Sequence, residues 1–159
     1  MSLHIDPFMV NDSNIEGLKI ISAQMSTDDR GTVRGLHGEA MSKLVTVAYG
    51  SVFGAYVDTR PYSKTFGAVQ TVHITPGIQV FVPQGVCNGF QALEDTEYLY
   101  FFDKEWIPGM PGTALCPLDP ELCIKWPIFI DSRNLNQISE KDSNAPTLKE
   151  LRKILGMNK

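Results

Sequence analysis

The sequence contains few cysteines, and their spacing fits neither a disulfide scaffold nor a zinc site. Three are present in 159 residues, at Cys87, Cys116 and Cys123. An odd number of cysteines without a C-x-x-C pair argues against both kinds of structure. Because free thiols are normal in a reducing compartment, we expect three unpaired cysteines in a cytoplasmic protein.

Histidine is equally scarce, and this scarcity bears on metal binding. His4, His37 and His73 lie far apart in the chain, and no two of them form an H-x-H pair. Transition-metal sites need several imidazole, thiolate or carboxylate ligands brought together. We therefore expect no metal ion. In the segment TVHIT, His73 is expected to face water from a strand, and His4 is expected to be a terminal residue.

Long hydrophobic runs and an excess of positive charge are also missing. No apolar run approaches the roughly 20 residues of a membrane span. The opening MSLHIDPFMVNDSN lacks the basic and apolar regions of a signal peptide. The formal net charge is −4, so the protein as a whole does not attract nucleic acid or an anionic membrane. An anionic ligand would need a local cluster of Arg and Lys.

What the sequence does contain is typical of one all-β domain. Apolar residues make up 43% and charged residues 20% of the chain, which predicts a single globular domain over residues 1–159. Runs rich in Val, Ile, Tyr and Phe, bounded by turn residues, recur along the middle of the chain. This recurrence predicts a β-sandwich or barrel. The expected strands lie within residues 17–24, 43–50, 51–59, 68–75, 78–85 and 96–103.

The segments between and after these runs carry local signals. Gly50 and Ser51 separate two strand runs and predict a hairpin turn. Apolar residues occupy both alternations of residues 43–59, so we expect these strands to be covered on both faces. A helical pattern, with leucines three and four residues apart, is confined to residues 145–155. Residues 109–137 combine proline with large apolar side chains, which predicts an ordered wrap.

The segment RGLHGEA, residues 34–40, holds the strongest candidate for acid–base chemistry. No G-x-S-x-G motif is present, and Cys87 has no base near it in sequence, so we interpret Cys87 as a packed thiol. An imidazole titrates near neutrality and suits proton abstraction, which makes His37 a candidate base. A hydrogen-bonded histidine in a turn is the other interpretation.

Three basic residues lie close together in this part of the sequence. Arg30, Arg34 and Lys43 fall within fourteen positions of an acidic chain. They could line a pocket for a phosphate or pyrophosphate. A solvated charged edge explains the same cluster equally well.

The order of several motifs identifies a known family. RGLH, KLVTVAYGSVFGAYVDTRPYSKTFG, VPQGVCNGF, EYLYFF, WP and ISEKD follow one another between about Ile20 and Pro146. In this the chain resembles the dTDP-4-dehydrorhamnose 3,5-epimerases, as a divergent and shortened member. The resemblance implies a cupin-type jelly-roll barrel without metal or cofactor, and usually a homodimer. It also implies a dTDP-linked 4-keto-6-deoxysugar as substrate, with proton exchange next to the ketone.

The resemblance assigns the acid–base residues. His37, within RGLH, stands where the family has its catalytic base, and Asp142, within ISEKD, matches the acid that pairs with it. Such an acid fixes the tautomer of the imidazole and stabilises its protonated form. Tyr100, within YLYFF, matches the tyrosine that acts as the acid on the other face of the sugar.

The resemblance also assigns residues that hold the substrate. Lys43 matches the lysine of the family, and Arg34 matches the arginine ahead of GLH. A cation beside the C4 oxygen would stabilise the developing enolate. Gln24 lies where the family places a glutamine that contacts the substrate. Arg30, within DDRG, is a weaker candidate because its spacing from RGLH differs.

Several departures from the family pattern concern the same pocket. Asn88 replaces a histidine, Gly54 replaces an aspartate and Trp106 stands in place of a second tyrosine. Asn88 and Trp106 are therefore expected to line the substrate site in altered form. The changes leave three functions open: a 3- and/or 5-epimerase, a non-catalytic sugar-nucleotide-binding cupin, and a keto-isomerase on the same substrates.

Overall fold

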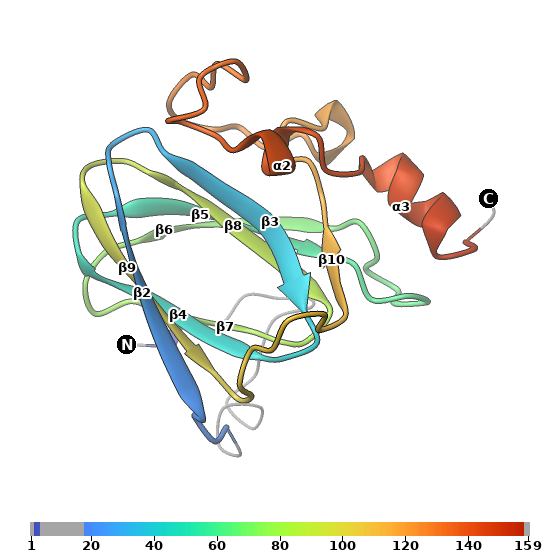
Figure 1. Ribbon diagram of the computed structural model, residues 1–159, viewed down its shortest axis with the longest axis horizontal. Coiled ribbons are helices and arrows are strands. Elements are labelled where there is room, and N and C mark those ends of the chain that lie inside the picture. Colours follow the sequence, from blue (N-terminus) through green and yellow to red (C-terminus); the bar gives the residue numbers. More distant parts are fainter. Residues whose placement is uncertain (1, 4–17, 158–159) are drawn as a thin grey trace.

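The computed structural model describes residues 2–3 and 18–157, which form two five-stranded sheets stacked face to face (Figure 1). One sheet has the order β1-β7-β4-β9-β2 and the other has the order β10-β3-β8-β5-β6. The strands are β1 (Ser2–Leu3), β2 (Ser22–Asp28), β3 (Val33–Glu39), β4 (Lys43–Tyr49), β5 (Val52–Asp58), β6 (Val69–Ile74), β7 (Gln79–Val82), β8 (Val86–Ala92), β9 (Thr96–Phe102) and β10 (Gly112–Ala114). The fold is therefore all-β, as the sequence predicts.

The turn predicted at Gly50 and Ser51 is not a hairpin. β4 and β5, on either side of it, belong to different sheets and pair with other strands. The chain crosses from one layer to the other here, as in a jelly roll. Local signals cannot distinguish the two cases, because both place glycine at positive φ, here 77° at Gly50, between two apolar strands.

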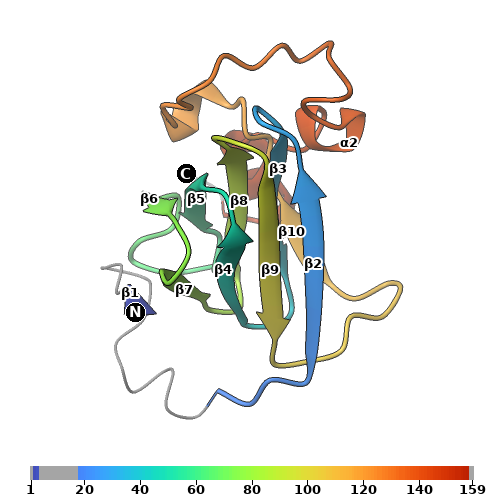
Figure 2. The same ribbon diagram turned by 90° about the vertical axis from the view of Figure 1, so that its left-hand side faces the viewer.

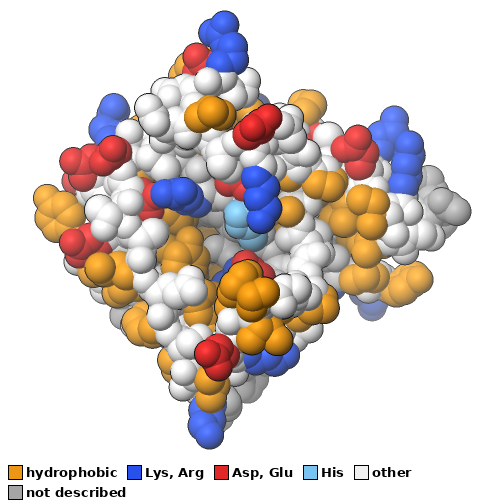
Figure 3. All heavy atoms as spheres, in the orientation of Figure 1, with side chains coloured by type: hydrophobic (Ala, Val, Ile, Leu, Met, Phe, Trp, Pro, Cys, Tyr) orange, Lys and Arg blue, Asp and Glu red, His pale blue; other side chains and the backbone are white. Residues whose placement is uncertain are grey.

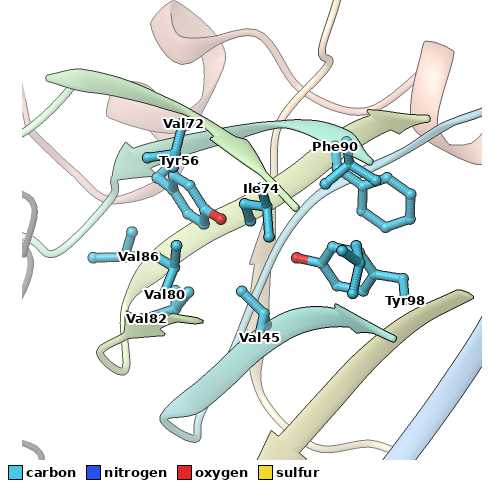
Figure 4. Packing of buried hydrophobic residues seen from close by; sticks show 11 residues of the cluster. Val45, Tyr56, Val72, Ile74, Val80, Val82, Val86, Phe90 and Tyr98 are labelled. Carbon is cyan, nitrogen blue, oxygen red and sulfur yellow. The ribbon is translucent and has the colours of Figure 1, made fainter. Parts of the chain in front are cut away.

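The barrel interior is apolar over most of its length. Alternate residues of each strand face inward, and Figure 4 shows how the inward side chains of both sheets meet. Phe90 of β8 and Tyr98 of β9 stack with ring centroids 4.1 Å apart. The buried cluster consists of Val45, Val47, Val52, Tyr56, Val72, Ile74, Val80, Val82, Val86, Phe90 and Tyr98.

A second apolar layer covers the outer face of the β3–β8–β5 sheet. It is formed by the C-terminal wrap, which includes a 3-10 turn (Pro120–Leu122), α2 (Glu140–Ser143) and α3 (Leu148–Ile154); Figure 2 shows this segment crossing one end of the strands. A capping box at Thr147 begins α3. The buried members of this layer are Leu36, Ala55, Val57, Cys87, Leu115, Leu122, Leu148 and Leu151.

Most of the sequence predictions about elements hold. The C-terminal helix and the ordered wrap are confirmed, and His73 is exposed on β6. β5 is largely buried on both faces, but the expectation fails at the end of β4, where Ala48 and Tyr49 are exposed. All three cysteines are free. The strands β3 and β8 were missed, because glycines interrupt the apolar pattern of both, and the short β10 was missed too. The strand expected within residues 17–24 begins only at Ser22 and runs on to Asp28 as β2. His4 lies outside the described residues. Within residues 2–3 and 18–157, no helix is long and apolar enough to cross a membrane.

Candidate active site

A β-bulge in β3 brings two of the predicted residues to one side of the sheet. Arg34 pairs with Phe90 and His37 pairs with Asn88. Two residues of β3 therefore lie between these pairs opposite a single residue of β8. Without the extra residue, positions 34 and 37 would face opposite sides. Gly35 adopts a φ of +82°, and a Cβ there would lie 2.6 Å from the carbonyl oxygen of Asn88. Glycine is therefore required at the bulge.

His37 is paired with a carboxylate that comes from the other end of the chain. α2 lies beside the half of β3 that β10 leaves uncovered, where Val33 forms a parallel bridge to Ile138. From there the Oδ1 of Asp142 lies 2.6 Å from the Nε2 of His37. The Ser139 hydroxyl accepts a hydrogen bond from the backbone N–H of Asp142 and begins the helix. His37 is thus a strand residue of a histidine–carboxylate pair, and the turn interpretation is wrong.

The second oxygen of Asp142 holds the bulge itself. Oδ2 accepts a hydrogen bond of 3.2 Å from the backbone N–H of Gly35. Burial raises the pKa of Asp142, but the bond and charge of His37 and the Gly35 N–H outweigh it, so the net pKa is lowered. The carboxylate is therefore ionised at neutral pH and fixes both the ring and the backbone beside it.

Lys43 opens β4 and points into the same end of the barrel. Lys43 is 3% exposed, and its Nζ donates a hydrogen bond to the Oδ1 of Asn88 at 2.8 Å. Nζ also forms an ion pair with Glu39 and a long bond of 3.5 Å to the backbone oxygen of His37. Buried ammonium groups need such partners, because burial without them is costly.

Arg34 stands at the rim of the site and is held by an acid on the neighbouring sheet. Its Nε donates to the Oδ1 of Asp28 at 2.7 Å, while half of its side chain remains exposed. The buried Asp28 thus fixes one edge of the guanidinium and leaves the other donors free for a ligand.

Aromatic side chains of β9 form the wall opposite His37. Tyr100 stacks against Phe102 with ring centroids 5.8 Å apart, and Tyr98 lies below it at 4.7 Å. Burial, the largest effect, raises the pKa of Tyr100. Its hydroxyl therefore stays protonated at neutral pH. Gln24, on β2, is the residue paired with Tyr100 across the sheet.

These residues enclose one pocket at the polar end of the barrel interior. Its volume is about 190 Å³. Figure 3 shows the corresponding face, where a pale blue histidine surface lies in a central hollow among basic and acidic side chains. The lining residues are Gln24, Arg34, Gly35, His37, Glu39, Lys43, Asn88, Tyr100 and Phe102.

Two of the predicted site residues lie elsewhere. Trp106 is 51% exposed in the loop after β9 and is not among the residues that line the pocket, so its contact with substrate stays a prediction. Arg30 lines a separate surface cleft with Asn134 and Gln137. Its turn precedes β3, and the residues of β3 that line the pocket are Arg34, Gly35, His37 and Glu39.

The structure also gives physical meaning to two departures from the family pattern. Asn88 lines the pocket and holds Lys43. A Cβ on Gly54 would lie 2.8 Å from the hydroxyl of Tyr56. Figure 4 shows this hydroxyl pointing into the barrel interior, where it takes the room that a larger residue at position 54 would need.

The sequence analysis gave no role to three lining residues, Gly35, Glu39 and Phe102. All three belong to quoted motifs, RGLHGEA and YLYFF. The four-residue spacing of Glu39 and Lys43 indicates an ion pair only on a helix, and here the two residues lie on strands of different sheets. Among residues 2–3 and 18–157, no group of three His, Cys, Asp or Glu side chains could hold a metal ion.

Comparisons with known proteins agree on one family. Residues 5–150 match the family model described as dTDP-4-dehydrorhamnose 3,5-epimerase. An RmlC homolog of Streptococcus pyogenes is 37% identical over 126 residues, which are 77% of this chain and 61% of that protein. The dTDP-4-dehydrorhamnose 3,5-epimerase of Mycobacterium tuberculosis is 32% identical over 142 residues, 85% of this chain and 69% of that protein.

A solved structure shares the fold over most of the chain. The dTDP-6-deoxy-D-glucose-3,5-epimerase of Legionella pneumophila, in complex with dTDP-4-keto-L-rhamnose, superimposes with a TM-score of 0.75 at 28% identity. The match covers 88% of this chain and 78% of that one. The chain thus spans between about three fifths and four fifths of the length of these relatives.

Proposed function

The chain belongs to the dTDP-4-dehydrorhamnose 3,5-epimerase family, and on this premise we propose that it epimerises a dTDP-linked 4-keto-6-deoxysugar at C3, C5 or both. The observation that carries the proposal is the arrangement of one pocket. It brings together a histidine–carboxylate pair, a buried lysine and a half-buried tyrosine at a single cavity.

The first step is removal of a proton from the carbon next to the ketone. The Nε2–H of His37 donates to Asp142, which leaves Nδ1 to accept the substrate proton. As the imidazole becomes positively charged, the ionised carboxylate at 2.6 Å stabilises it. The C–H electron pair moves to the C4 oxygen and forms an enolate.

The cations of the pocket stabilise that enolate. Lys43 is the buried cation at the pocket floor, and its ammonium would donate to the C4 oxygen as negative charge develops. Arg34, at the half-exposed rim, suits the diphosphate of the nucleotide or the same oxygen. Gln24 would contact the sugar or the nucleotide from β2.

The second step returns a proton to the opposite face of the carbon. Tyr100 lies on the wall across from His37, so its hydroxyl proton would go to the carbanion carbon while the enolate carbonyl re-forms. The resulting phenolate would regain a proton from solvent and the imidazolium of His37 would release its proton to solvent, which restores both groups. The stereocentre is inverted without any net oxidation or reduction, so the reaction itself requires no redox cofactor.

Deuterium exchange tests the proposed function directly. We expect the protein, incubated with dTDP-4-keto-6-deoxyglucose in D₂O, to introduce deuterium at C3 or C5, as seen by NMR. His37→Ala should abolish the exchange without loss of the fold. His73→Ala, which alters an exposed histidine on β6, is the matched control and should leave it unchanged. No deuterium entry with any 4-keto-6-deoxysugar nucleotide would refute the proposal.

One observation favours a second candidate, a non-catalytic sugar-nucleotide-binding protein. The ammonium of Lys43 already has three oxygen partners, Glu39 among them. Tight calorimetric binding of the nucleotide sugar without exchange would support this candidate. A keto-isomerase on the same substrates would instead give a product whose carbonyl carbon has moved, which NMR distinguishes from an inverted centre. Homodimer formation stays a prediction from the family.

A further inference from the structure

Three oxygens surround the ammonium of Lys43 in the structure as it stands, and the one from Glu39 is held by an ion pair. An ammonium group carries three N–H donors. The three oxygens around Nζ belong to the Glu39 carboxylate, the Asn88 amide at 2.8 Å and the His37 backbone at 3.5 Å. A ketone oxygen can therefore reach a proton of Lys43 only if one of these oxygens leaves.

Of the three partners, Glu39 is the one that can move. Asn88 is 4% exposed in the middle of β8, and the His37 carbonyl belongs to the backbone of β3. Glu39 is the last residue of β3, its side chain is 27% exposed, and it lines the pocket. Its carboxylate can turn toward solvent, where water would replace Lys43 as its partner.

We propose that Glu39 is a displaceable internal ligand of Lys43, which occupies the place of the substrate's ketone oxygen and sets the preference of the pocket for the group at C4. This inference rests on the proposed function, because it takes Lys43 as the group that holds the C4 oxygen. Glu39 acts through Lys43 and is therefore a specificity residue.

The charge state of Glu39 fits this role. Burial raises the pKa of this carboxyl, but the charge and the hydrogen bond of Lys43 outweigh it, so the net pKa is lowered. The carboxylate is thus ionised at neutral pH. An anionic acceptor is a stronger partner for an ammonium than a neutral ketone, and it yields most readily when the oxygen that replaces it carries the charge of an enolate.

The same argument separates ketones from alcohols. A ketone at C4 has no proton, so it can only compete with Glu39 for Lys43. A hydroxyl at C4 can donate its own proton to the Glu39 carboxylate while the carboxylate stays beside Lys43. The internal ligand should therefore weaken the binding of the 4-keto sugar and leave the binding of the 4-hydroxy sugar almost unaffected.

Calorimetry on Glu39→Gln tests the inference. The two probes are dTDP-4-keto-6-deoxyglucose and its 4-hydroxy counterpart, dTDP-6-deoxyglucose. Replacing an anionic acceptor on a buried ammonium with a neutral one should lower the apparent Kd of the ketone roughly fivefold to tenfold. The Kd of the alcohol should change by less than about twofold.

Two further variants make the comparison decisive. Glu97→Gln removes the same charge from β9, at a residue on the opposite face of that strand from Tyr98 and Tyr100, and should leave both Kd values unchanged. Glu39→Asp keeps the charge but shortens the reach to Lys43, so an intermediate fall in the ketone Kd is expected. If Glu39→Gln does not fold, the ketone and alcohol Kd values of Glu39→Asp test the inference instead.

Three results would overturn the inference: a ketone Kd that is unchanged or higher, an equal fall for ketone and alcohol, or no measurable binding of either ligand. An equal fall would mean a general charge effect on an anionic nucleotide. The proposed function is tested apart from this, by deuterium exchange in the unaltered protein. If that exchange is absent, the proposed function fails, while the two Kd ratios still decide the role of Glu39.

Discussion

Replacing Asp142 with Asn should separate the carboxylate's charge from its shape. In the protein, one oxygen accepts from His37 at 2.6 Å and the other from the Gly35 N–H at 3.2 Å. An asparagine has a single acceptor oxygen, so its NH₂ group must face one of these two donors. If the NH₂ group faces the Gly35 N–H, two donors meet and that bond is lost. If it faces His37, Nε2 must act as the acceptor, so the ring takes the other tautomer and Nδ1 can no longer accept the substrate proton.

The size of the effect follows from these two bonds. A hydrogen bond to a charged group contributes about 1.5–3 kcal/mol, and a neutral one about 1 kcal/mol. We expect Asp142→Asn to lower the free energy of unfolding by about 2–3 kcal/mol. Loss of about 1.5–3 kcal/mol from the protonated imidazole should slow deuterium exchange roughly 10- to 150-fold.

The pH dependence of the stability loss in Asp142→Asn provides a further test. Because the net pKa of Asp142 is lowered in the folded protein, its stabilisation is complete above the ordinary carboxyl pKa and is lost as pH falls through the lowered value. Urea denaturation of the two proteins should therefore show a difference at pH 7 that shrinks toward pH 3. Glu140→Gln, which removes a charge from the exposed side of α2, is the control. Exchange within threefold of the unaltered protein and equal stability at pH 7 would refute the reasoning.

Two further substitutions test the scaffold of the site. Gly35→Ala places a Cβ 2.6 Å from the Asn88 carbonyl oxygen at a φ of +82°. We therefore expect it to lower the free energy of unfolding by at least about 2 kcal/mol and to abolish deuterium exchange. An unaltered urea midpoint and exchange rate would contradict the role of the bulge. Asp58→Asn removes a carboxylate bonded by Arg60, Ser63 and Thr65. Those bonds outweigh burial and lower its pKa to about 2, so the stabilisation should be present at neutral pH and lost as pH falls from the ordinary carboxyl range toward 2. Denaturation curves that coincide for the two proteins across this range would disprove it.

The strands that were recognised from the sequence are those whose own residues carry the signal. β5 and β9 are rich in apolar and aromatic residues, and both were placed to within two residues of their bounds. β3 and β8 contain the glycines that the site needs at the bulge, at Gly35 and in contact with it at Gly89. The features that build the pocket therefore obscured the strands that carry it.

The site residues likewise differ in whether a local motif identifies them. His37, Lys43, Arg34 and Tyr100 could be proposed from short motifs because each motif keeps its residue types and order. Trp106 was placed in the pocket only by analogy with another aromatic residue, and it lies exposed in a loop outside the set of residues that line the pocket. Sequence order alone does not say which way a loop turns.

By itself, the sequence determined that the chain is an all-β domain and which motifs it carries. These are properties of local composition and spacing, whereas the choice of His37 as the reactive histidine came from the resemblance to the family. Only the tertiary structure decided that Asp142, 105 positions from His37, reaches its ring around the open edge of β3. It also decided that Glu39 turns onto Lys43, because contacts between strands of different sheets depend on a bulge, a crossover and the packing of the C-terminal wrap.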